Sequence, residues 1–107
     1  MRVPIVIDVT AADIDAGRDF RVDEGDKHPL ELAAERVWIR TGLHYQYSQT
    51  AGWRWWLGDV VLPDVGLAFL MNFAEWDAAG RPSESTPSPC KFFLAFREES
   101  DVQSSVL

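Results

Sequence analysis

The chain reads LHYQYSQTAGWRWWL from residue 43 to residue 57, and this stretch decides the sheet of the fold. Ala51-Gly52 indicates a tight turn, and aromatic residues alternate with other residues on both sides of it. Residues that alternate along a strand share a face, and paired aromatic side chains stabilise a hairpin by about 0.2 to 1 kcal/mol per pair. We expect six side chains to form the core face of this hairpin: Leu43, Tyr45, Tyr47, Trp53, Trp55 and Leu57.

Three side chains of the same stretch should point to the opposite face, namely His44, Arg54 and Trp56. Trp and Arg are among the residues enriched at the energetic centres of protein interfaces. These three residues are therefore the predicted contact surface for a protein partner. The alternative is that a helix packs across this face and buries Trp56.

The sequence before the hairpin predicts one strand and two helices. Residues 3–9 are rich in β-branched side chains, which favour a strand. Thr10 is suited to cap a short helix, which Gly17 should end in a left-handed conformation. A charged loop over 18–28 leads to Pro29, which is well placed at the first position of a second helix that runs to about Thr41. Its expected core side is Leu30, Ala33, Ala34, Val37 and Trp38.

The sequence after the hairpin predicts a short strand segment over 60–62, a long helix and a final strand over 91–97. The long helix, about Val65 to Ala79, has one apolar stripe for the core: Val65, Phe69, Phe73 and Trp76. A second stripe lies nearly opposite: Leu67, Met71, Ala74 and Ala78. A helix that is apolar on two sides needs a second cover. Either another element of the chain covers the second stripe, or another chain does, in which case the stripe is a self-association face of a homodimer.

These elements add up to a single small α+β domain over residues 1–97. We expect about four strands in one antiparallel or mixed sheet, with an aromatic hairpin, packed by two or three helices. Residues 98–107 read as a flexible acidic tail.

Composition and charge exclude several classes of function. The 107 residues are 47% hydrophobic and carry a net charge of −7, which disfavours direct nucleic-acid binding. No apolar run is long enough to span a membrane, and the first residues do not read as a signal peptide, so we expect a cytoplasmic protein. Nine carboxylates between Asp8 and Glu35 form either a solvated surface or an acidic face that mimics nucleic acid on a host enzyme.

The residues that carry catalytic or metal chemistry do not form a recognised pattern. Cys90 is the single cysteine, and we expect a buried or incidental thiol rather than a nucleophile. His28 lies among acidic residues, yet the spacing matches no standard metal site. A triad of Ser48, His44 and Asp59 lacks a nucleophile elbow. We therefore predict no catalytic residue, no metal, no cofactor and no enzymatic activity.

Two stretches resemble a family of small uncharacterised proteins of actinobacteria and their bacteriophages. The first is Val9-Thr10-Ala11-Ala12-Asp13-Ile14-Asp15-Ala16-Gly17 followed by Pro29-Leu30-Glu31-Leu32-Ala33, and the second runs from Leu62-Pro63-Asp64 through Phe69 and Phe73 to Asp77-Ala78-Ala79-Gly80-Arg81-Pro82. Members often carry two cysteines where this chain has Gly25 and His28, so no metal or redox role carries over. The resemblance implies a phage-encoded protein in the cytoplasm of a bacterial host.

The sequence therefore predicts a small non-enzymatic protein that binds an unidentified host protein and modulates it. Two alternatives stay open: an acidic inhibitor that mimics nucleic acid, and a structural homodimer with no separate ligand. No membrane partner is expected.

Overall fold

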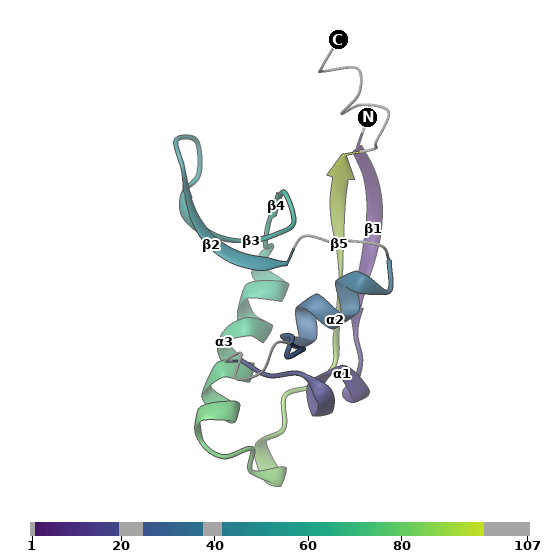
Figure 1. The fold of residues 1–107 in the computed structure, drawn as a ribbon, viewed down its shortest axis with the longest axis vertical. Coiled ribbons are helices and arrows are strands. Elements are labelled where there is room, and N and C mark those ends of the chain that lie inside the picture. The colour runs from purple at the N-terminus through teal and green to yellow at the C-terminus, as the bar shows by residue number, and fades with distance from the viewer. Residues whose placement is uncertain (1, 20–24, 38–41, 98–107) are drawn as a thin grey trace.

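The computed structural model describes residues 2–19, 25–37 and 42–97, and it confirms an α+β domain with an aromatic hairpin (Figure 1). The elements follow in this order: β1 (Arg2–Val9), α1 (Ala11–Ala16), α2 (Pro29–Glu35), β2 (Leu43–Ser48), β3 (Gly52–Leu57), β4 (Val60–Val61), α3 (Asp64–Ala78), a 3₁₀ turn (Ser83–Ser85) and β5 (Cys90–Arg97). The predicted tail 98–107 and the predicted core residue Trp38 lie outside the described residues.

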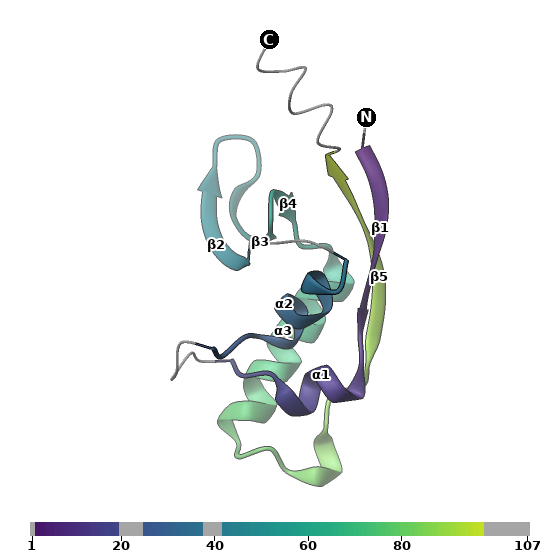
Figure 2. The same ribbon diagram turned by 45° about the vertical axis from the view of Figure 1, so that its right-hand side comes forward.

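The strands divide between two antiparallel sheets, where the sequence suggested one sheet of about four strands. One sheet pairs β1 with β5, and the other is the meander β2-β3-β4. The predicted sharing of one hairpin face is confirmed, because Tyr45 pairs with Trp55 and Tyr47 pairs with Trp53. Figures 1 and 2 show the meander on one side of the molecule and the β1–β5 pair on the other. The meander therefore projects from the rest of the domain, and only part of it packs against the core.

The core lies where α2 and α3 pack on the β1–β5 pair. Ile7, Leu30 and Phe73 are fully buried. In α3 the predicted core residues Phe69, Phe73 and Trp76 are buried, but Val65 is 50% exposed, so that part of the prediction is wrong. Gly66 takes its place: a Cβ at Gly66 would lie 2.8 Å from the side chain of Leu62 and 3.1 Å from Phe92. The helix therefore approaches β5 through its glycine, which turns Val65 outward.

The start of α1 is capped as predicted. The Thr10 side chain accepts a hydrogen bond from the Asp13 backbone, and the Asp13 carboxylate accepts one from the Thr10 N–H, which completes a capping box. Gly17, however, has φ −74° and is not left-handed, so the predicted reason for its presence is wrong. The actual reason is close packing, because a Cβ there would lie 2.4 Å from the Pro29 ring.

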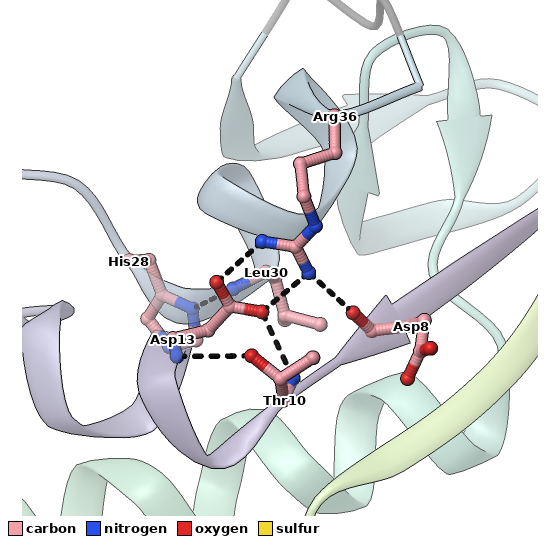
Figure 3. Close-up of polar contacts among 6 residues, drawn as sticks. All are labelled: Asp8, Thr10, Asp13, His28, Leu30 and Arg36. Carbon is pink, nitrogen blue, oxygen red and sulfur yellow. Dashed lines mark hydrogen bonds and ion pairs between the residues drawn. The ribbon is translucent and has the colours of Figure 1, made fainter.

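A bidentate ion pair joins α1 to the end of α2 (Figure 3). Both terminal nitrogens of Arg36 donate to the buried Asp13 carboxylate at 2.6 Å, and Nη2 also donates to the Asp8 carbonyl. Burial disfavours the charge on Asp13, but the hydrogen bonds from Arg36 and Thr10 outweigh it and lower the pKa of Asp13. The Asp13 carboxylate therefore stabilises the contact between α1 and α2 and is not part of the exposed surface.

Arg81 joins the end of α3 to the end of α1. Its Nε donates to Asp77, its Nη1 donates to the Asp15 carbonyl and its Nη2 donates to the Gly17 carbonyl. The guanidinium also lies over the ring of Trp76, 5.0 Å from the ring centre. Arg81 thus connects the C-terminal ends of α1 and α3, at the end of the molecule opposite the hairpin.

Candidate functional site

The tip of the aromatic hairpin is exposed. Tyr45 and Tyr47 are each 54% exposed and Trp53 is 57% exposed, so the prediction that these residues face the core is wrong. Trp55 is half-buried and Leu57 is fully buried. The alternation is as expected, but the body of the molecule covers the shared face only near the base of the hairpin (Figure 1). We call Tyr45, Tyr47 and Trp53 the aromatic tip.

The rings of the aromatic tip hold one another in place. Trp53 stacks on Tyr45 with ring centres 5.5 Å apart and planes 18° from parallel, and it also contacts Tyr47 at 5.6 Å. Tyr45 contacts Trp55 at 5.3 Å, which connects the tip to the half-buried base. Such aromatic contacts contribute about 0.5 to 1.5 kcal/mol beyond the area they bury. Contacts within the chain therefore position the exposed rings of the aromatic tip.

A groove of about 450 Å³ runs between the hairpin and α3. Met71 of α3, which is 50% exposed, forms part of its helical wall. The residues that line the groove, which we call the aromatic groove, are Tyr45, Trp53, Arg54, Trp55, Leu67 and Met71. The predicted self-association stripe is thus divided: Leu67 and Met71 line this groove, whereas Ala78 is exposed elsewhere on α3. Ala74 lines the neighbouring cleft.

The neighbouring cleft, of about 540 Å³, shares Trp55 and Met71 with the aromatic groove. It extends toward α2, where His28 and Glu31 line it. Asp19 also lines it, and burial, together with the charge of Asp77, raises the pKa of Asp19. Apolar and charged groups therefore meet at the base of the hairpin.

His28 is a structural cap at the start of α2, an outcome that the sequence did not indicate because histidine is an uncommon N-cap. Its Nδ1 accepts the Leu30 N–H at 3.0 Å, and its side chain is 4% exposed. The ring meets Phe73 edge-on at 4.9 Å. Burial lowers the pKa of His28 to about 4, although the charges of Glu31 and Asp77 act in the opposite direction. The imidazole is therefore neutral at pH 7, with its proton on Nε2.

Glu31 fixes the base of the hairpin to α2. One carboxylate oxygen accepts the His28 N–H at 2.9 Å, and the other accepts the Leu43 N–H at 3.1 Å. Glu31 is buried, so this connection is shielded from water. The hairpin thus has a fixed base and a free tip, a suitable arrangement for presenting a contact surface.

The three predicted contact residues are not all in one place. Arg54 lines the aromatic groove, and its Nη1 donates to the Trp53 carbonyl at 2.8 Å. His44 and Trp56 stack on each other, with ring centres 6.4 Å apart, on the opposite face of the hairpin. Trp56 is half-buried, and its indole N–H donates to the Gln46 carbonyl. The residue that sequence reasoning assigned to the core, Trp53, is thus the more exposed tryptophan.

The structure shows the local surroundings of Cys90, His44 and Ser48. Burial, and next the charge of Asp8, raises the pKa of the Cys90 thiol to about 11, so the thiol is protonated at pH 7. His44 contacts the Gly42 carbonyl, and the Ser48 hydroxyl contacts Thr50. Within residues 2–19, 25–37 and 42–97 no group of three His, Cys, Asp or Glu side chains is arranged to hold a metal ion.

Comparisons with protein-family models, with curated proteins and with solved structures give no match to this chain. In the part of the chain that the structure describes, no helix is both long and apolar enough to cross a membrane. The functional interpretation therefore depends on the geometry of the hairpin and its groove.

Proposed function

We propose that this protein acts without catalysis, by binding another protein through the aromatic groove and the aromatic tip. The observation that carries the proposal is the exposure of Trp53, Tyr45 and Tyr47, each more than half exposed, together with Met71, which is 50% exposed. Large contiguous apolar patches on soluble proteins mark interaction sites, and Trp and Tyr dominate the energetic centres of interfaces.

Charge indicates what kind of partner this surface fits. The chain carries a net charge of −7, yet residues 43–57 contain no carboxylate and include the cation Arg54. Arg54 lines the groove beside Trp53. The proposed partner therefore presents an apolar side chain to the groove and a carboxylate to Arg54. His44 and Trp56 form a second proposed contact on the opposite face of the hairpin.

The proposed setting, a phage-encoded modulator of a host protein in a bacterial cytoplasm, depends on the sequence resemblance. The acidic mimic of nucleic acid is the weaker proposal. Asp13 is paired with Arg36, and Glu31 binds two backbone N–H groups, so both are used inside the fold. These two of the nine carboxylates are buried and do not contribute to an acidic surface.

The test is capture of partners from a host lysate, followed by a binding constant for the purified partner. We expect Trp53→Ala to weaken binding by tenfold or more, on the order of 1.4 kcal/mol, because it removes the centre of the stacked rings. Arg54→Glu should weaken it as well, since it opposes the partner's carboxylate. The binding constant of Trp56→Ala shows whether the second proposed contact, formed by His44 and Trp56, also binds the partner.

Phe93→Ala is the matched control. Phe93 is 68% exposed, so it is also a large apolar side chain at the surface, but it belongs to β5 rather than to the hairpin. It should bind like the unaltered protein. A partner that is held equally by the unaltered protein, Trp53→Ala and Arg54→Glu would refute the proposed surface.

A further inference from the structure

Among the residues that the structure describes, no strand covers the outer edge of β2. The order β2-β3-β4 places β2 at the outer edge of the meander. Natural edge strands are usually blunted by proline, by charged side chains or by a bulge. β1 carries Pro4 and Asp8, and β5 carries Lys91. The β2 sequence LHYQYS contains no proline and no Lys, Arg, Asp or Glu. Another strand can therefore pair with the outer edge of β2.

The hairpin register shows which backbone groups of β2 are available. Gly58 donates its N–H to the Gly42 carbonyl, so this pair is hydrogen-bonded across the hairpin. Every second position shares that pattern in an antiparallel ladder, and the positions between them point outward. Leu43, Tyr45 and Tyr47 therefore direct their N–H and C=O groups away from β3. The Leu43 N–H is already taken by Glu31.

The occupant that fits this edge best is a second copy of the chain. Two β2 strands related by a twofold axis at Gln46 would pair Tyr45 of each copy with Tyr47 of the other. This register uses the outward N–H and C=O groups of both tyrosines, which gives four backbone hydrogen bonds. Moving the axis to Tyr45 would instead require the Leu43 N–H, which Glu31 already occupies.

Local charge does not oppose self-pairing at this edge. Two chains of net charge −7 repel each other, and carboxylates brought together at an interface would add to that repulsion. β2 has no carboxylate and neither does its partner β3, so the hairpins can meet without opposing like charges. A twofold contact of this kind is closed and does not extend into a fibre.

We propose that the protein forms a twofold dimer through antiparallel pairing of β2 with β2 of a second copy. The two meanders become one six-stranded sheet, and Tyr45 and Tyr47 of both copies lie side by side on one face. The proposal goes beyond the binding function: it concerns the backbone edge of β2, whereas partner binding concerns the side chains of the aromatic groove and the aromatic tip. Gln46 of one copy lies directly opposite Gln46 of the other, on the sheet face away from the tyrosines. At such non-hydrogen-bonded positions opposed side chains approach most closely.

Charged substitutions at Gln46 test whether the twofold axis of the dimer passes through this residue. Light scattering should give about twice the 12.1 kDa mass of one chain. Gln46→Lys should raise the dimer dissociation constant by roughly tenfold, because like charges then oppose each other. Gln46→Glu should raise it by a smaller factor, because Arg54 lies opposite position 46 in the hairpin and offsets the negative charge. An equimolar mixture of the two variants should restore the dimer. Gln49→Lys is the matched control: it adds the same charge to the same hairpin but faces Leu43 of the other copy, so the dimer should persist.

Three results would overturn the proposal. The first is a monomer at every concentration up to the millimolar range. The second is a dimer that both Gln46 variants leave intact. The third is a dimer that Met71→Glu breaks and Gln46→Lys does not, which would assign self-association to the α3 stripe. Circular dichroism of each variant confirms that it is folded.

A cross-link gives an independent measurement. Gln46→Cys in a Cys90→Ser background should form an interchain disulfide on mild oxidation, because opposed residues at such a position bring their Cβ atoms within disulfide reach. Gln49→Cys in the same background should not. Equal cross-linking of both variants would contradict the register.

Discussion

Acidification is the perturbation that isolates the role of His28. The neutral ring accepts the Leu30 N–H through Nδ1 and is packed against Phe73. Protonation would remove that acceptor and place a cation in an apolar site at a helix N-terminus. The unfolded chain has neither constraint and binds the proton readily. Stability should therefore fall as the pH falls.

The magnitude follows from the two pKa values of His28, 6.5 when unfolded and about 4 when folded. A folded pKa below the unfolded value contributes stability that is fully present above the unfolded pKa and is lost as the pH falls toward the folded pKa. Each unit of difference corresponds to roughly 1.36 kcal/mol, so the full loss is about 3 kcal/mol. At about pH 5 the loss should be on the order of 2 kcal/mol.

Urea unfolding at about pH 7.5 and about pH 5 measures this loss. His28→Asn keeps an efficient N-cap and removes the titrating group, so its free energy of unfolding should change far less between the two pH values. His44→Asn, which alters the other histidine, should retain the loss. The reasoning is refuted if the unaltered protein is equally stable at both pH values, or if His28→Asn loses as much stability as the unaltered protein. An NMR titration of His28 with a midpoint near 6.5 would refute it directly.

Two further predictions concern the packing around α1. Gly17→Ala should destabilise the protein by about 2 kcal/mol or more, because a Cβ would lie 2.4 Å from the Pro29 ring, whereas Gly25→Ala has open space and should be nearly neutral in thermal unfolding. Arg36→Lys should cost about 1 to 2 kcal/mol, since an ammonium cannot reproduce the bidentate contact with Asp13. That cost should shrink in an Asp13→Asn background, and an unchanged cost in a double-mutant cycle would contradict the role of the pair.

Features set by local sequence were predicted correctly. The Thr10 cap, the start of α2 at Pro29 and the alternation of the hairpin depend on residues a few positions apart. Capping and turn preferences act at that range, so they can be read from one sequence. The core positions Phe69 and Phe73 followed from helical spacing for the same reason.

Features set by contacts distant in sequence were not predicted. Alternation shows which side chains of the hairpin share a face, but coverage of that face depends on where α3 lies. Trp53 was therefore assigned to the core although it is exposed. Gly17 ends α1 as predicted, but the reason for a glycine there emerges only when Pro29 is brought against it. The pairing of β1 with β5, from opposite ends of the chain, likewise divides the strands into two sheets.

The separation between base and tip gives the hairpin its functional meaning. Leu57 is fully buried at the base, and replacement of such a leucine by alanine typically costs about 2 to 5 kcal/mol. Trp53 at the tip is more than half exposed and contacts other exposed rings, so its replacement should cost far less stability. A loss of binding in Trp53→Ala can therefore be attributed to the surface rather than to unfolding.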